Sequence, residues 1–154
     1  MSSQLQAELQ QHKPFSCLEQ EAHLSIARTA AVLEHAMAEA LRPHQLTPTQ
    51  YNALRILRGA GEKGLCRNSV RDRLIARVPD ATRLLDRLEE MGHVTRVREG
   101  DDRRFVRANI TRVGLDLLRR LDAEMVASHH RLLGHLGARK LKALIDLMAE
   151  ARGG

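Results

Sequence analysis

The chain has 154 residues, enough for one ordinary domain, and 43% of them are hydrophobic although only 2% are aromatic. This composition excludes a disordered chain and requires a core of aliphatic side chains, which favours a mainly helical protein. The formal net charge is +6, and +5 of it falls between Arg55 and Arg107, where there are 14 basic and 9 acidic residues.

The basic side chains of that segment are nearly all arginines. Arginine makes planar, bidentate contacts with phosphates and with guanine edges. The segment therefore indicates a polyanionic partner. The alternative interpretation is a solvated basic face with no partner at all.

Several functional classes lack support in the sequence. No run of about 18 apolar residues predicts a transmembrane helix, and the polar N-terminus predicts no secretory signal. Two cysteines, Cys17 and Cys66, do not amount to a disulfide framework. A phosphate-binding glycine loop, a nucleophile elbow and a metal-hydrolase pair are missing. We therefore expect a cytoplasmic protein that has no membrane partner, is not an enzyme and uses no cofactor.

The N-terminal part of the chain is predicted to be helical. Residues 1–13 favour a short helix, which Pro14 interrupts. Apolar residues then recur at three- and four-residue steps from Cys17 to about Leu41, the pattern of an amphipathic helix. Arg42-Pro43 ends this helix, because the residue before a proline disfavours helical backbone.

Three short helices are predicted next. Thr47 can cap the first of them, with Pro48 at its first position and Gln50 completing a capping box. A group of glycines ends this helix. The second and third helices are predicted over Asn68–Ala76 and Pro79–Gly92.

Two alternating segments rich in β-branched residues follow, His93–Arg98 and Phe105–Ile110, with a polar, glycine-containing turn between them. Thr111 is placed to cap a further helix that reaches about residue 133, and a last helix carries the apolar residues of 141–148. Three short helices followed by a hairpin is the order of a winged helix-turn-helix. The predicted fold class is therefore mainly α (α+β), with a two-stranded β-hairpin as the wing.

The first and last long helices carry apolar stripes that a single winged unit cannot cover. Because such stripes are unfavourable in water, we expect them to pack against each other and against a second copy of the chain. The predicted organisation is N-terminal dimerisation helices at 1–45, a winged unit at 46–111 and C-terminal dimerisation helices at 112–154.

Four segments resemble the multiple-antibiotic-resistance regulator (MarR) family in the same order: Leu46–Tyr51, Val78–Glu89, Asp102–Arg104 and Ile110–Gly114. The last two look like the wing signature of that family, an Asp-x-Arg followed by a hydrophobic-Thr-x-x-Gly element. The resemblance implies a homodimeric transcriptional regulator, a repressor that binds a pseudo-palindromic operator in double-stranded DNA. One helix per subunit would enter the major groove and the wing the minor groove, and a small-molecule effector would release the DNA.

The predicted contact residues fall into groups by element. The third short helix and its start contribute candidate base or phosphate contacts, Asp80, Thr82, Arg83 and Arg87. The wing contributes Asp102, Arg103 and Arg104, and the resemblance implies that Arg104 enters the minor groove while Asp102 orients it. Candidate phosphate contacts flank the second helix at Arg67, Arg71 and Arg77. For Arg83 and Arg87 the alternative is pairing with neighbouring carboxylates on a solvated face.

No effector-binding residue is assigned, apart from Tyr51 as a candidate beside the expected cleft between the winged unit and the dimerisation helices. Cys17, near the start of a long helix, is an alternative oxidation sensor. A sequence-independent architectural DNA-binding protein and a protein-binding winged helix are further alternatives. The histidines show no pair at metal-ligand spacing on one helix face, so no metal site is predicted.

Overall fold

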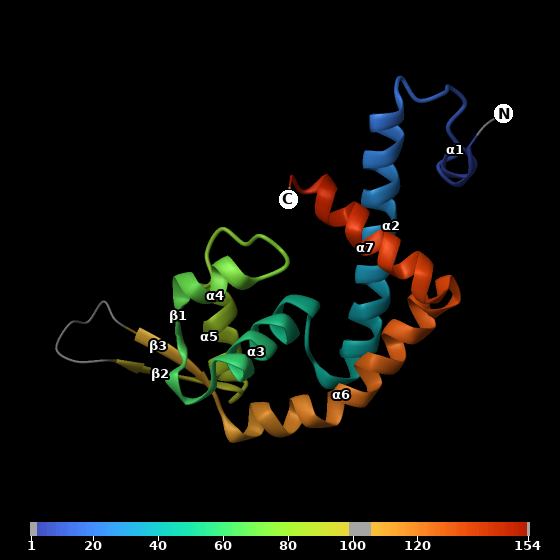
Figure 1. The fold of residues 1–154 in the computed structure, drawn as a ribbon. Coiled ribbons are helices and arrows are strands. Elements are labelled where there is room, and N and C mark those ends of the chain that lie inside the picture. The colour runs from blue at the N-terminus through green and yellow to red at the C-terminus, as the bar shows by residue number, and fades with distance from the viewer. Residues whose placement is uncertain (1–2, 99–105, 154) are drawn as a thin grey trace.

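The structure, a computed structural model, describes residues 3–98 and 106–153. A unit of short helices and a small sheet lies to one side, and long helices extend away from it (Figure 1). The chain runs through α1 (Gln4–Glu8) and the long α2 (Leu18–Leu41), which ends in a 3-10 turn at Arg42–His44. The predicted end of the first long helix at Arg42-Pro43 is confirmed.

The capping motif predicted for the next helix is present. In α3 (Pro48–Ala60) the Gln50 amide donates to Thr47 Oγ1 over 3.1 Å, and the Thr47 amide donates to Gln50 Oε1 over 3.0 Å. Pro48 occupies the first turn, where its missing N–H leaves no hydrogen bond unmade. The cap fixes where α3 begins and so which of its residues face inward.

The two helices that follow differ from prediction at their facing ends. Helix α4 (Arg67–Arg73) stops before Leu74, whose backbone is extended, and α5 begins only at Thr82 and ends at Glu90. The predicted bounds, Asn68–Ala76 and a start at Pro79, were wrong here. Asp80 explains the later start, because its carboxylate accepts the Thr82 backbone amide over 2.9 Å and so takes the place of a helical partner.

The two strands predicted for the hairpin pair with each other, and a third strand that was not predicted joins them. Strands β2 (Val94–Arg98) and β3 (Val106–Ile110) pair antiparallel with Val94 opposite Ile110. A third strand, β1 (Leu65–Cys66), pairs with the other edge of β3, so the order is β1-β3-β2. Its two residues are too few to show an alternating pattern, which is why the sequence did not reveal it.

The Thr-x-x-Gly element after β3 has a structural explanation. Thr111 caps α6 (Arg112–Leu133) by accepting the Gly114 amide over 3.1 Å, and its hydroxyl donates to the Gly92 carbonyl over 2.7 Å. A Cβ on Gly114 would lie 2.6 Å from the His93 carbonyl oxygen, so only glycine lets α6 approach this turn. The motif therefore holds the start of α6 against the end of the α5–β2 turn. A 3-10 turn and α7 (Gly137–Ala151) complete the chain.

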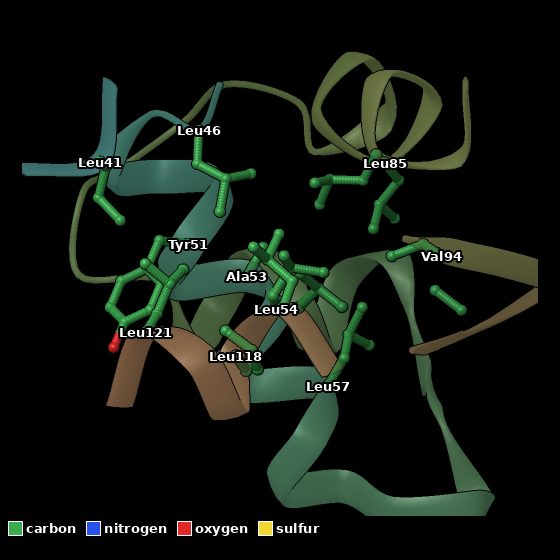
Figure 2. Close-up of a cluster of buried hydrophobic side chains, with 14 of the residues drawn as sticks. Leu41, Leu46, Tyr51, Ala53, Leu54, Leu57, Leu85, Val94, Leu118 and Leu121 are labelled. Carbon is green, nitrogen blue, oxygen red and sulfur yellow. The ribbon is translucent and has the colours of Figure 1, made fainter. Parts of the chain in front are cut away.

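One aliphatic core holds the winged unit together (Figure 2). Helix α3 contributes Leu54 and Leu57, α5 contributes Leu85 and Leu88, and α6 contributes a further row. That row consists of Leu117, Leu118, Leu121 and Met125. Tyr51 is the one aromatic side chain of this core, in keeping with the composition. The end of α2 joins through Leu41, which is the sole buried residue of that helix.

His93 makes the stability of this core depend on pH. Burial, reinforced by the positive charge of Arg120, lowers the pKa of His93, and its Nδ1 is buried with no hydrogen-bond partner among the described residues. The unfolded chain therefore binds this proton more readily than the folded one. The contribution of neutral His93 to the free energy of unfolding is complete above the ordinary pKa of histidine. It is lost as the pH falls through the lowered pKa of the folded state. We expect the Tm to fall more between about pH 7.5 and about pH 5.5 in the wild type than in His93→Gln.

The matched control for this measurement is His130→Gln, because His130 is an exposed histidine of α6. Its Tm should follow the wild-type pH dependence. Equal slopes for the wild type and His93→Gln would contradict the role assigned to His93.

Candidate nucleic-acid interface

An arginine-rich surface covers α4, α5 and the connection between them. The sheet and the α4–α5 pair lie at the same end of the molecule, away from α2 and α7 (Figure 1). Exposed arginines on this surface are Arg67, Arg71, Arg73, Arg77, Arg83 and Arg87. Their concentration on two successive helices provides the positive surface that a polyanion requires.

Helix α5 separates a buried apolar face from an exposed basic one. Leu85 and Leu88 are buried in the core, whereas Arg83 and Arg87, four residues apart, point to solvent. Arg87 Nη1 lies 3.1 Å from Glu90 Oε2. Arg83 has no ion pair or hydrogen bond with any residue that the structure describes. Its guanidinium is therefore available to an external acceptor without breaking an internal pair.

The N-terminal end of α5 is organised by its own polar residues. Asp80 Oδ1 accepts from the Thr82 hydroxyl over 2.7 Å, and Arg67 Nη1 donates to the same hydroxyl oxygen over 3.1 Å. The hydrogen bonds from the Thr82 hydroxyl and backbone amide, with the charge of Arg67, lower the pKa of Asp80. The ionised form of Asp80 is thus favoured just before α5, and the contact of Arg67 with Thr82 links α4 to α5. That Asp80, Thr82 and Arg67 touch DNA stays a prediction.

The remaining predicted DNA contacts differ in their surroundings. Arg71 pairs with its neighbour Asp72, with Nη2 and Oδ1 3.0 Å apart. Arg77 lies exposed in the α4–α5 connection. The wing residues Asp102, Arg103 and Arg104 lie outside the described residues, so their roles stay predictions.

A positioning residue, Arg96, was missed by the sequence analysis. From β2, its Nη2 lies 2.6 Å from both Asp86 Oδ1 and Glu89 Oε2 of α5, and its Nε donates to Glu89 over 3.0 Å. These bonds join the basic helix to the sheet that carries the wing. The sequence did not predict these ion pairs, because Arg96 lies on a strand and its partners lie on a helix. No local sequence pattern defines how that strand and that helix are placed relative to each other.

A second tie, between Arg58 and Asp122, connects the winged unit to the long helices. Arg58 of α3 donates two parallel hydrogen bonds to Asp122 of α6, over 2.9 and 3.0 Å. Bidentate pairs of this kind fix relative orientation as well as distance. The hydrogen bonds and charge of Arg58 lower the pKa of Asp122.

A cleft of about 490 Å³ opens between α2, the start of α3, the α4–α5 connection and the end of α6. It lies at the junction of the winged unit and the long helices, where a cleft was expected. Helix α6 contributes to the lining through its end, at His129, Leu132 and Leu133. Tyr51 packs in the core beneath Arg55, whose Cζ lies 5.9 Å from the ring centroid, and does not line the cleft.

Comparison with known proteins identifies the family. No family model and no curated protein matches the chain. Among solved structures, a MarR transcription factor from Planctomyces limnophilus is 40% identical, with 88% of this chain and 98% of that chain covered and a TM-score of 0.69. The chain belongs to the MarR family of transcription factors. The resemblance read from the sequence is therefore confirmed.

More distant MarR structures share the fold. A MarR family transcriptional regulator from Streptomyces coelicolor, in complex with DNA, is 22% identical, with a TM-score of 0.78 over 92% of this chain and 91% of that one. CouR from Rhodococcus jostii, bound to p-coumaroyl-CoA, is 24% identical, with a TM-score of 0.71 over 87% and 93%. MarR proteins are regulators and not enzymes, and the winged-helix fold predicted for this chain is confirmed.

Three further observations bear on the remaining expectations for this MarR protein. None of the described helices has the length and apolar character needed to cross a membrane. Within residues 3–98 and 106–153, no three His, Cys, Asp or Glu side chains group so as to hold a metal ion. Cys17 and Cys66 are free and exposed.

Proposed function

We propose that this MarR protein is a homodimeric repressor that binds a pseudo-palindromic operator and releases it when a small molecule occupies the cleft. The observation that carries the proposal is the exposed, unpaired Arg83 on a helix whose opposite face is buried in the core. A helix of this kind fits the major groove, which presents acceptors that arginine reads on guanine. The Streptomyces coelicolor regulator in complex with DNA has the same fold, which supports this use of the surface.

Exposed apolar residues support the homodimer. Leu18 of α2 is 80% exposed, and Ile145 and Leu147 of α7 are 65% and 58% exposed. No residue of α7 is buried in the single chain. Helices of this length with a bare apolar face are stable in water only when another surface covers them. Two-fold pairing through α2 and α7 would cover these faces and present two α5 helices to two half-sites.

The effector role rests on the cleft. Its volume is within the range of small-molecule sites, and its walls come from both the winged unit and the long helices. CouR, with the same fold, is bound to p-coumaroyl-CoA. A ligand in such a junction can alter the relation between the two parts if it prefers one arrangement over the other.

Operator binding tests the proposal directly. The purified protein is titrated onto the DNA upstream of its own gene and onto unrelated duplexes, at several salt concentrations. We expect one short palindrome to be preferred by about a thousandfold. Arg104→Ala should weaken this binding and reduce the salt dependence by about one ion. Equal affinity for every duplex, unaffected by Arg104→Ala, would establish an architectural DNA-binding protein instead.

A further inference from the structure

We propose that the cleft binds an apolar organic amine, with its ammonium group paired to Glu34. This inference rests on the proposed function, because it names the chemical class of the effector. It follows from which side chains form the cleft walls.

The body of the cleft is apolar. Side chains from all four segments contribute to it, among them Leu33, Met37, Pro48, Ile75, Leu132 and Leu133. Walls of this composition favour a hydrocarbon or aromatic body, since removing such a group from water stabilises the complex roughly in proportion to its area. They cannot by themselves discriminate among ligands that differ in their charged group.

The polar groups of the cleft decide the sign of that charge. Among the described residues that line the cleft, Glu34 carries the one formal charge, and none of them is a lysine or an arginine. The other polar side chains are Thr49, Asn52 and His129. An anionic ligand here would face a like charge with no cation to compensate it, which is unfavourable at low dielectric.

The start of α3 leaves the Thr49 amide as its one backbone donor toward an anion in the cleft. Pro48 has no N–H, and the Gln50 amide already donates to Thr47. Glu34, in contrast, has neither an ion pair nor a hydrogen bond with any residue that the structure describes. Its carboxylate is therefore free to accept from an ammonium group at the edge of the cleft.

The same cleft touches the connection between the two DNA-facing helices. The Ile75 amide donates to Asn52 Oδ1 over 2.9 Å, and both residues line the cleft. Ile75 follows Leu74, where α4 stops, and its side chain is 89% exposed. A ligand that donates a hydrogen bond to Asn52 Oδ1 shares this acceptor with the Ile75 amide and so contacts the connection that leads to α5. An ammonium group is such a donor and a carboxylate is not.

A matched ligand pair tests the charge assignment on the full-length protein. The two probes are 4-phenylbutylamine and 4-phenylbutanoate, which share a skeleton and differ in charge. Affinity is measured by calorimetry and DNA release by fluorescence anisotropy, at about pH 8, where histidines are ordinarily neutral. We expect the amine to bind and to release DNA, and the carboxylate to bind at least tenfold more weakly.

Glu34→Gln should lower the affinity for the amine about three- to tenfold, because the pair is partly exposed to water. Glu21→Gln is the matched control, since Glu21 is a carboxylate of the same helix that does not line the cleft. Equal binding of both probes, or equal effects of the two variants, would overturn the proposal. Binding of neither probe would also overturn it and would indicate that the second copy fills the cleft. Operator binding measured without any probe keeps each of these failures distinct from failure of the proposed function.

Discussion

Gly64→Ala is expected to lower the free energy of unfolding by about 3 kcal/mol, the sum of a backbone and a packing cost. Gly64 has a φ of +60°, in the left-handed region that disfavours any residue with a Cβ. A Cβ there would lie 2.6 Å from the Ala108 carbonyl oxygen and 2.6 Å from Asn109 Oδ1. The clash falls where β1 pairs with β3, so the sheet must open to accept it. Urea denaturation at fixed protein concentration measures the loss.

Gly59→Ala is the control for this substitution. Gly59 lies in the last turns of α3, and a Cβ there would meet nothing within 4 Å. Alanine at such a position should stabilise the helix by up to about 1 kcal/mol. If both variants unfold at the same urea concentration, β1 and β3 do not approach each other as described.

Arg83→Ala is expected to weaken operator binding about ten- to a hundredfold, the range for losing one base-reading arginine. Arg83 is exposed on α5, and its side chain makes no hydrogen bond with any residue in the described part of the chain. Arg87 is engaged by Glu90 over 3.1 Å, so Arg87→Ala should have the smaller effect. Fluorescence anisotropy with a labelled operator at constant salt measures the operator affinity of each variant.

Arg139→Ala removes the same charge from α7, on the other side of the molecule, and controls for net charge (Figure 1). It should leave operator affinity within about twofold of the wild type, because distant exposed charges are screened at physiological salt. A loss for Arg139→Ala as large as that for Arg83→Ala would mean that α5 does not read the operator.

The parts of the fold that were predicted correctly are those encoded by neighbouring residues. Thr47, Pro48 and Gln50 specify the start of α3 within one turn, and Thr111 specifies the start of α6 in the same way. The predicted end of α4 and the predicted start of α5 were wrong, because contacts between the two helices decide them. The Asp80 carboxylate accepts the Thr82 amide, so α5 starts about one turn later than Pro79 suggested, and Arg67 of α4 donates to the Thr82 hydroxyl.

Features formed by segments that are distant in the sequence could not be predicted from it. The pairing of β1 with β3 brings Leu65 opposite Ala108, and the bonds of Arg96 cross from strand to helix. The cleft likewise combines four segments, including the end of α6, which no periodicity marks as its neighbour. The arginine surface was predicted because successive helical residues create it, whereas which arginine remains unpaired depends on the fold.

The short strand β1 has a mechanical consequence. It runs directly into α4 while it is bonded to β3, and Arg96 fastens the adjacent strand to α5. Both helices of the arginine-rich surface are thereby attached to the sheet at separate points, which restricts their movement relative to each other. In the proposed dimer, we therefore expect the proposed effector to change the separation and tilt of the two winged units and to leave the internal arrangement of each unit unchanged.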